Sequence, residues 1–412
     1  MKLDQKRWAV LAASCFVNLC IGSLYAWSVF ASPMASYLAE ITGRQVTGIS
    51  IVFTVANSVG PVTMITGGRI NDRLGPRWAI FLGGLVFGGG MIASGFARSL
   101  LQLVVSYGLG CGLGMGLVYS CTVSNSVKFF PDHRGLAGGL TTASYGISAV
   151  LVPPVAAAMM GRWGITMTFR ILGAVIMVIV CTAAFFIVRC PEGYQPAGWT
   201  GSAAALSSRQ GKDWRGMLRD PVFFVMLIIL FSGAFAGLMS ISQASAMAQK
   251  MAGMTPGAAA AAVSILALFN TAGRILSGYL ADRIGPVSTL RAVFLFSTCG
   301  LLTLFAFGQG HTVPFLIGIS VVGFGFGAVM GVFPGFTASQ FGSEHNSVNY
   351  GILFIGFAAA GYFGPTTMTW ILSRSGSYRP AFLTAAGLTL VGIAATLLYQ
   401  GMEKRARSAP AR

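Results

Sequence analysis

The sequence predicts an all-α membrane protein with twelve transmembrane helices arranged as two six-helix pseudo-repeats. Composition is the first reason, because 55% of the 412 residues are hydrophobic and only 9% are charged. Apolar runs of about 18 residues or more recur along the whole chain, and each is long enough to cross a bilayer as a helix. The alternating pattern of a β-barrel is absent from the sequence. An internal repeat, described below, is the third reason.

Twelve apolar runs are separated by polar segments. They lie near residues 8–31, 46–67, 78–97, 101–125, 135–160, 167–188, 221–247, 257–280, 291–309, 314–337, 348–372 and 380–400. A longer polar stretch follows the sixth run and is rich in Gly, Pro, Ser and charged residues, which is typical of a linker. We therefore predict an N-terminal six-helix half at residues 1–190, a cytoplasmic linker at 191–219 and a C-terminal six-helix half at 220–412.

The net charge of +17 does not indicate a nucleic-acid partner, because the basic residues lie in short loops between apolar runs. Most Lys and Arg fall on the side of the N-terminus, which predicts a cell (inner) membrane protein with both termini in the cytoplasm. The run from Trp8 to Phe30 is too long for the core of a signal peptide, so we expect an uncleaved first helix. The basic linker is expected either to contact anionic lipid or to be a solvated tether.

The sequence shows no motif for metal, cofactor or enzyme chemistry. Seven cysteines, nearly all inside apolar runs and without CxxC spacing, indicate buried thiols rather than disulfides or zinc ligands. The glycines between Gly108 and Gly116 lack the Lys-Ser or Lys-Thr of a phosphate loop, so they indicate close helix packing. We expect no metal, no cofactor and no enzymatic activity.

One motif occurs twice. GGRINDRLGP (Gly67–Pro76) follows the second run, and SGYLADRIGP (Ser277–Pro286) follows the eighth, so that Asp72 and Asp282 are 210 residues apart. A fainter pair, FFPDHRG and QFGSEHN, has nearly the same spacing. Two motifs at one spacing indicate duplicated halves, which is how many secondary transporters are built.

This repeated loop resembles the cytoplasmic-loop signature of the major facilitator superfamily, and the resemblance extends over both halves. In that family the Asp and Arg of the loop make charge contacts that hold the cytoplasmic side shut. The resemblance therefore implies that Asp72, Arg73, Asp282 and Arg283 are gating residues. Ordinary turn chemistry, with Gly-Pro ending a helix, is the alternative.

Arg274 lies inside the eighth apolar run, and no acidic residue occurs between Lys250 and Asp282. If Asp282 marks the membrane surface, Arg274 lies roughly 12 Å below it at a rise of about 1.5 Å per residue. A cation at this depth is a functional-site hypothesis by default. It is expected to be satisfied either by backbone carbonyls, tyrosines and water, or by an anionic substrate, whose carboxylate a guanidinium can grip with two parallel hydrogen bonds.

Two tyrosines are expected at a similar depth, since Tyr119 and Tyr145 lie roughly 13 and 16 Å from the nearest charged helix end on the same measure. The segment Gly108–Gly146 is similar to the fourth and fifth helices of the oxalate/formate antiporter family, which is related to the proton-linked monocarboxylate transporters. GSLYAWSVF and FNTAGRILSG add to this resemblance. It implies that Tyr25, Tyr119 and Tyr145 line a central cavity; packing or an interfacial position is the alternative for each.

Two departures from these families narrow the expected substrate. The oxalate exchanger has a lysine in the eleventh helix where this chain has Phe357, so one buried cation remains and a monocarboxylate fits better than a dicarboxylate. Phe333 and Phe357 would then contribute to an apolar wall, with core or lipid packing as the alternative. Animal monocarboxylate transporters have an aspartate one turn before the arginine, where this chain has Asn270; an amide cannot carry a proton, which keeps exchange open.

The sequence therefore predicts a secondary active transporter of small monocarboxylates, of lactate or pyruvate size, working by alternating access with proton coupling. Obligatory organic-anion exchange of the oxalate/formate type is the alternative. The expected partners are a small carboxylate anion, protons if symport holds, and membrane lipid, and we expect a monomer. A membrane enzyme or a sensor is disfavoured, because no nucleophile motif or attached soluble domain is present.

Overall fold

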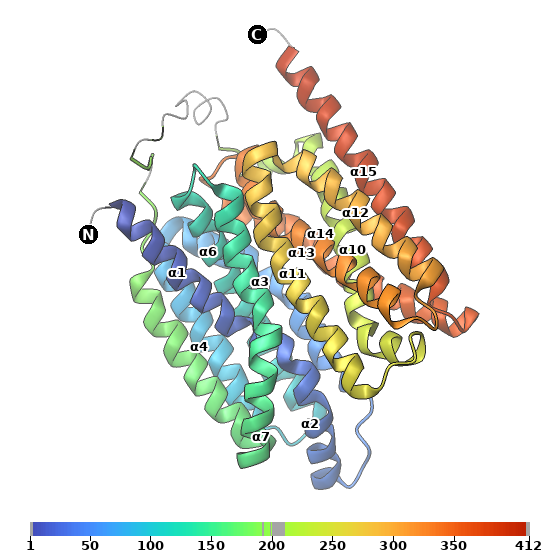
Figure 1. Cartoon of the computed structure of the whole chain (residues 1–412). Coiled ribbons are helices and arrows are strands. Elements are labelled where there is room, and N and C mark those ends of the chain that lie inside the picture. The colour runs from blue at the N-terminus through green and yellow to red at the C-terminus, as the bar shows by residue number, and fades with distance from the viewer. Residues whose placement is uncertain (1–2, 192, 198, 200–210, 409–412) are drawn as a thin grey trace. The chain divides into compact units, whose positions relative to one another are not determined.

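The structure, a computed structural model, describes residues 3–191, 193–197, 199 and 211–408. These residues form helices and connecting loops, with no strand among them (Figure 1). The all-α class predicted from the sequence is confirmed. Residues 200–210 of the predicted linker lie outside the described residues.

The helices that precede the linker are α1 (Leu3–Ile21), the 3₁₀ turn η1 (Gly22–Ala26), α2 (Trp27–Thr42), α3 (Ile51–Leu74), α4 (Pro76–Ser94), α5 (Leu100–Leu103), the π-helical stretch η2 (Val104–Cys111), α6 (Gly112–Phe129) and α7 (Arg134–Phe186). Those that follow it are α9 (Trp214–Leu218), α10 (Pro221–Lys250), α11 (Pro256–Ile284), α12 (Pro286–Phe307), α13 (Thr312–Phe341), α14 (Asn346–Ser375) and α15 (Arg379–Ser408).

Within the described residues, eleven helical segments are long and apolar enough to cross a membrane. One of them, α7, is 53 residues long and has non-helical backbone at Gly164, with φ 74° and ψ 170°. A positive φ is readily adopted only by glycine, so α7 turns at this residue and contains two of the predicted spans. The twelve predicted helices are thereby all present.

The first span is longer than the sequence predicts. It runs from Lys6 to Thr42, whereas the apolar run was expected to end near residue 31, just before Pro33. Pro33 lies inside α2, and a membrane helix tolerates proline because neighbouring groups satisfy the freed backbone. Met34 and Leu38 remain buried beyond it, and the helix ends where Gly43 adopts a left-handed conformation with φ 66°.

The repeated motif has the same backbone turn in both places. Gly75 has φ 89° and ψ 167°, and Gly285 has φ 86° and ψ 151°. Pro76 and Pro286 then begin the next helices, as proline at the first helical position favours. The Gly-Pro pair is therefore both a helix stop and a helix start in each half, which agrees with a duplicated fold.

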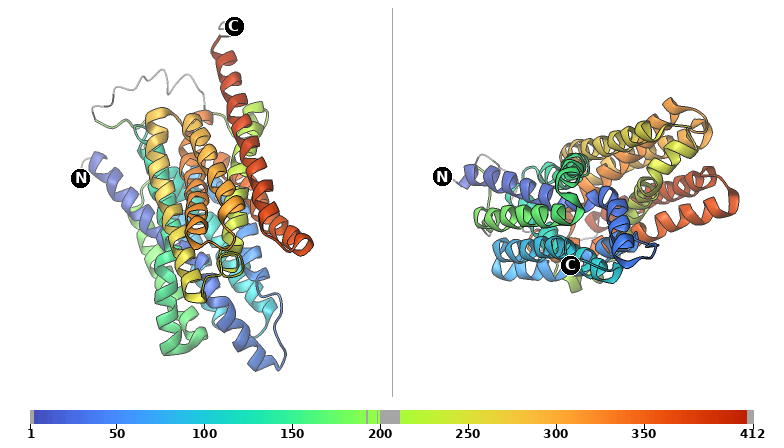
Figure 2. Two further views of the ribbon diagram at one scale, coloured as in Figure 1. Left: turned by 45° about the vertical axis from the view of Figure 1, so that its right-hand side comes forward. Right: turned by 90° about the horizontal axis from the view of Figure 1, so that it is seen from below.

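The described residues divide into two compact units. Unit 1 comprises residues 1–132, 144–211 and 341–352, and unit 2 comprises 133–143, 212–340 and 353–412. In unit 1, α6 packs against α1, α3 and α4. In unit 2, α15 packs against α10 and α12, and Figure 2 shows α15 as the red helix that ends the chain. Each unit thus takes a short segment from the other half of the chain, and the predicted half boundaries at 190 and 220 stay a prediction.

Candidate functional site

Arg274 lies on α11 in unit 2 and is almost completely buried, with 2% of its surface exposed. Its Nη1 donates a hydrogen bond to the carbonyl oxygen of Thr142 at 2.8 Å, and its Nε donates to Oδ1 of Asn270 at 3.1 Å. Both acceptors are neutral, and the ion pairs among the described residues involve other side chains. The guanidinium therefore has hydrogen-bond partners in the protein while its charge has no described counter-charge.

Glycines on α7 and α13 allow the backbones of these two helices to lie close to the backbone of α11. A Cβ atom at Gly139 of α7, or at Gly331 of α13, would collide with the backbone of Arg274. A Cβ at Gly327 would likewise collide with the carbonyl of Asn270. Close approach of this kind is the main use of glycine between membrane helices, and it holds the arginine against α7 and α13.

An aromatic stack continues from the arginine. The Cζ atom of Arg274 lies 5.9 Å from the ring centroid of Phe326, within reach of a cation–π interaction. Phe326 stacks on Phe357 at 6.3 Å, and Phe357 stacks on Phe354 at 4.4 Å. The structure therefore places Phe357 two contacts away from the arginine, and Phe326, which the sequence analysis did not single out, between them.

Phe333 belongs to a different aromatic group of unit 2. Its ring meets Phe336 edge-on at 5.8 Å, and Phe336 in turn meets Tyr399 at 5.1 Å. Phe333 is fully buried, which agrees with the core-packing alternative as well as with a pocket wall. A role of Phe333 at the arginine stays a prediction.

The three tyrosines singled out in the sequence come together in unit 1. The ring of Tyr145 is in edge-to-face contact with Tyr25 at 5.1 Å and with Tyr119 at 5.2 Å. Tyr25 lies in the 3₁₀ turn η1, whose Gly22 leaves no room for a Cβ beside the carbonyl of Tyr145. This close approach lets η1, α6 and α7 converge on one cluster. The cluster belongs to unit 1 and Arg274 to unit 2, so their convergence on one substrate stays a prediction.

The two repeated aspartates make different contacts. In unit 2, Asp282 accepts hydrogen bonds from the backbone N–H groups of Gly135 at 2.7 Å and Leu136 at 2.8 Å, in the first turn of α7. These are donors that a helix leaves unsatisfied at its N-terminus, where a negative charge is also favoured by the helix dipole. Arg283 is exposed, with its Cζ atom 5.1 Å from the centroid of the Tyr279 ring.

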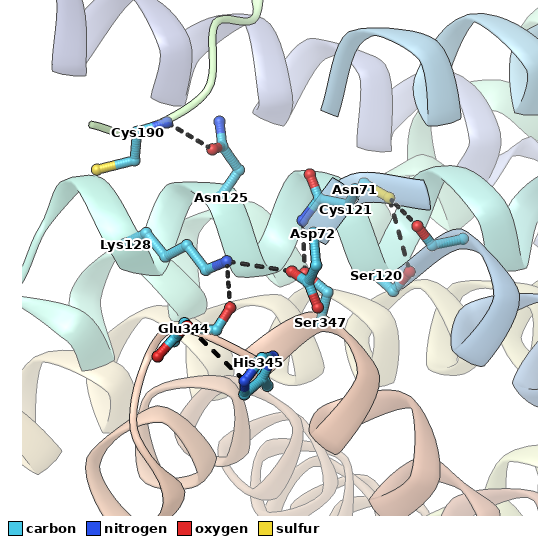
Figure 3. Close-up of polar contacts among 11 residues, drawn as sticks. Asn71, Asp72, Ser120, Cys121, Asn125, Lys128, Cys190, Glu344, His345 and Ser347 are labelled. Carbon is cyan, nitrogen blue, oxygen red and sulfur yellow. Dashed lines mark hydrogen bonds and ion pairs between the residues drawn. The ribbon is translucent and has the colours of Figure 1, made fainter. Parts of the chain in front are cut away.

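In unit 1, the partner of Asp72 is Lys128, with 3.3 Å between Nζ and Oδ1 (Figure 3). Lys128 also donates to the carbonyl of Glu344 at 2.9 Å, and Asn71 donates to Oγ of Ser347 at 2.6 Å. These bonds tie the start of α14 to α3 and α6. Lys128 and Asn71 were not singled out in the sequence, because only the folded chain brings residue 344 to residue 128. Arg73 is exposed.

Cys190, which follows α7, is a buried thiol of unit 1. Its backbone N–H donates to Oδ1 of Asn125 at 3.3 Å, and burial raises the pKa of the thiol to about 12. Because the thiolate is the reactive form, Cys190 should resist N-ethylmaleimide at pH 7 in the folded protein and react after denaturation. Mass spectrometry of the labelled peptides checks this, and rapid labelling of the native protein would contradict the packing of this segment.

The sequence matches the profile of the Major Facilitator Superfamily over residues 16–365. The chain belongs to this superfamily. It is a multi-pass membrane transporter.

Several known proteins resemble this Major Facilitator chain over nearly its whole length. The oxalate:formate antiporter of Oxalobacter formigenes is 28% identical over 391 residues, which cover 94% of this chain and 90% of that protein. Monocarboxylate transporter 13 of Rattus norvegicus is 25% identical over 393 residues, covering 93% and 87% respectively. The uncharacterized MFS-type transporter YhjX of Escherichia coli is 25% identical over 356 residues, covering 86% and 85%.

Solved structures agree on the fold. The transporter FucP in its outward conformation superposes with a TM-score of 0.71 at 15% identity, covering 96% of this chain and 99% of that one. A double-tryptophan mutant of XylE gives a TM-score of 0.76 at 14% identity, covering 96% and 95%. At these identities the likeness concerns the Major Facilitator fold alone.

Proposed function

We propose that this chain is a secondary active transporter of small monocarboxylates, of lactate or pyruvate size, that works by alternating access. Arg274 binds the substrate carboxylate, and Asn270 orients the guanidinium. Tyr25, Tyr119 and Tyr145 are further substrate-binding residues, whose hydroxyl groups can donate hydrogen bonds to a carboxylate while their rings exclude water. The protein acts as a monomer in the cell membrane with both termini in the cytoplasm.

The observation that carries this proposal is the charge of Arg274. It is buried at 2% exposure, and its hydrogen-bond acceptors in the described structure are a carbonyl and an amide oxygen. A buried cation without a counter-charge is costly, and an anion that brings one negative charge relieves that cost in the bound state. Because a carboxylate brings an opposite charge and can accept two parallel hydrogen bonds from the guanidinium, it can displace the present partners.

The aromatic stack supports a substrate with a single charge and a short carbon chain. Phe326, Phe357 and Phe354 offer apolar surface beside the guanidinium, and none of them can balance a second negative charge. Two of the similar proteins are named for small carboxylates, as an oxalate:formate antiporter and as a monocarboxylate transporter. These names support the substrate class for this chain.

Obligatory anion exchange is the second candidate, and one observation favours it. The residue hydrogen-bonded to Nε of Arg274 is Asn270, an amide that cannot take up a proton. Proton coupling would then have to run through the substrate itself or through water. The similarity to an oxalate:formate antiporter supports exchange as well.

Transport by purified protein in liposomes tests the proposal and separates the two modes. We expect L-lactate to enter when a pH gradient, acid outside, is imposed on vesicles that contain no anion substrate. Entry only into vesicles preloaded with lactate or formate would assign exchange instead. The absence of lactate, pyruvate and formate transport under both conditions would refute the proposed substrate class.

We also propose that Asp282 is a gating residue, because it caps the first turn of α7 from a different helix. Asp282→Asn removes the charge and leaves one oxygen for two N–H donors, and such a capping charge is worth about 1 kcal/mol. We expect up to about a tenfold fall in the initial rate of lactate uptake, with lactate binding unchanged in a thermal-shift assay. Asp213→Asn, which removes the capping carboxylate of the short helix α9, is the control and should transport nearly normally. An unchanged rate in Asp282→Asn would remove the gating assignment.

A further inference from the structure

Arg274 and Asp282 lie on one face of α11 and hold the same neighbour. Residues four apart on a helix share a face, and eight residues span about 12 Å. This face meets the first turns of α7 within unit 2. We call the contact the α7–α11 seam. It consists of Arg274, Gly278 and Asp282 on α11 and Gly135, Leu136, Gly139 and Thr142 on α7.

The middle of the seam contains no side chain. A Cβ atom at Gly278 would collide with the carbonyl of Gly135, and one at Gly139 would collide with that of Arg274. Directional bonds lie at the two ends of the seam: Asp282 to the N–H groups of α7 at one end, and Arg274 to the carbonyl of Thr142 at the other. The guanidinium is thus part of what holds α7 against α11.

Unit 1 has an equivalent contact that lacks this cation. Met64, Gly68 and Asp72 of α3 precede Arg274, Gly278 and Asp282 by 210 residues each. Gly68 lies against the backbone of Ser347, and Gly351 lies against Met64, so α3 meets the start of α14 as α11 meets the start of α7. The inner end of this contact is an uncharged methionine. Of the two repeated contacts, the α7–α11 seam is the one whose inner end is a charged side chain.

The substrate carboxylate and the carbonyl of Thr142 are therefore both acceptors for the guanidinium of Arg274. A carboxylate is gripped by parallel N–H groups of a rigid planar fork, which turns as one body. We propose that a carboxylate bound to Arg274 turns this fork and draws Nη1 away from Thr142, which releases the inner end of the α7–α11 seam, so that substrate occupancy weakens the hold of α11 on the first turns of α7. This inference rests on the proposed function, since it assumes that the anion binds at Arg274.

A distance measurement across the outer end of the seam tests the inference. Spin labels at His133→Cys and Ile284→Cys, both exposed positions, report the separation of α7 and α11 in a cysteine-free, transport-competent parent. Without ligand, Arg274→Gln should raise the ratio of long to short distances roughly tenfold, the factor expected for the loss of one hydrogen bond to a charged group. Arg291→Gln is the matched control. Arg291 bonds Thr396 and Gln400 of α15 instead, so its loss should leave the distribution unchanged.

Addition of L-lactate to the parent is the second measurement, and it decides alone if Arg274→Gln does not fold. Saturating lactate should lengthen the same distance. If the parent binds lactate in a thermal-shift assay but its distance distribution does not change, the proposal that substrate weakens the α7–α11 seam is wrong. The transport proposal is unaffected by that result. A parent that binds no monocarboxylate would refute the proposed substrate, while Arg274→Gln would still test the seam without ligand. An Arg274→Gln distribution equal to that of the parent would overturn the inference.

Discussion

Replacement of Arg274 by glutamine should abolish lactate uptake. The glutamine side chain ends two bonds short of the position of Nη1, so it does not replace the bond to the carbonyl of Thr142, and it brings no positive charge to a site where the described acceptors are neutral. Loss of one partner of a buried, hydrogen-bonded charge pair costs about 3–5 kcal/mol, so initial uptake should fall by at least about 100-fold. Radiolabelled L-lactate uptake into proteoliposomes, normalised to reconstituted protein, measures the effect.

The matched control for this variant is Arg291→Gln. Arg291 also lies in a membrane helix of unit 2, and its guanidinium bonds side chains of α15. If any loss of a partly buried arginine merely destabilised the protein, both variants would lose uptake together. Uptake by Arg274→Gln within about threefold of the wild type, at equal protein levels, would contradict the assignment of Arg274 to the substrate-binding site.

Replacement of Phe357 by lysine should change the preferred substrate from lactate to oxalate. Phe357 lies in the stack between Phe326 and Phe354, where it supplies apolar surface near Arg274. A lysine there adds a second buried cation, which favours a dianion and disfavours a monoanion. The ratio of oxalate to lactate uptake should rise by at least about tenfold, equivalent to about 1.4 kcal/mol.

Phe357→Met is the control for this exchange, since it removes the ring without adding charge. Methionine fills irregular apolar gaps, so this variant should keep its preference for lactate even if the rate falls. Competition of each unlabelled acid against labelled lactate gives the preference independently of expression. Equal preferences in the lysine and methionine variants would show that the charge balance at Phe357 does not set selectivity.

Much of the fold was predictable because a bilayer imposes long, apolar helices. The repeated aspartate loop and the Gly-Pro pair that ends it could be recognised in the sequence. In the structure, Gly75 and Gly285 have nearly the same backbone conformation. The predicted end of the first span, near residue 31, was wrong, because the helix continues to Thr42 and accommodates Pro33 within α2. Local sequence does not show the neighbouring helices that make this possible.

The candidate site was predictable only in part. Arg274 was identified by its charge in an apolar run, and the tyrosine cluster around Tyr145 by depth and resemblance. Phe326, Lys128 and Thr142 were missed. Phe326 and Lys128 have ordinary residue types for their helices, and Thr142 contributes a backbone carbonyl that carries no sequence signal at all. Contacts between distant helices give these residues their importance.

The division of the chain into two units has a consequence for biogenesis. Residues 341–352 pack in unit 1, although the other residues of that unit are complete by residue 211. During synthesis, Gly68 of α3 therefore stays without its close backbone neighbour until Ser347 has left the ribosome. The N-terminal half, which is synthesised first, therefore lacks this contact until residues 341–352 of the C-terminal half have been made. We expect a chain truncated before residue 341 to remain open to quality-control proteases, however well its own six helices have been inserted.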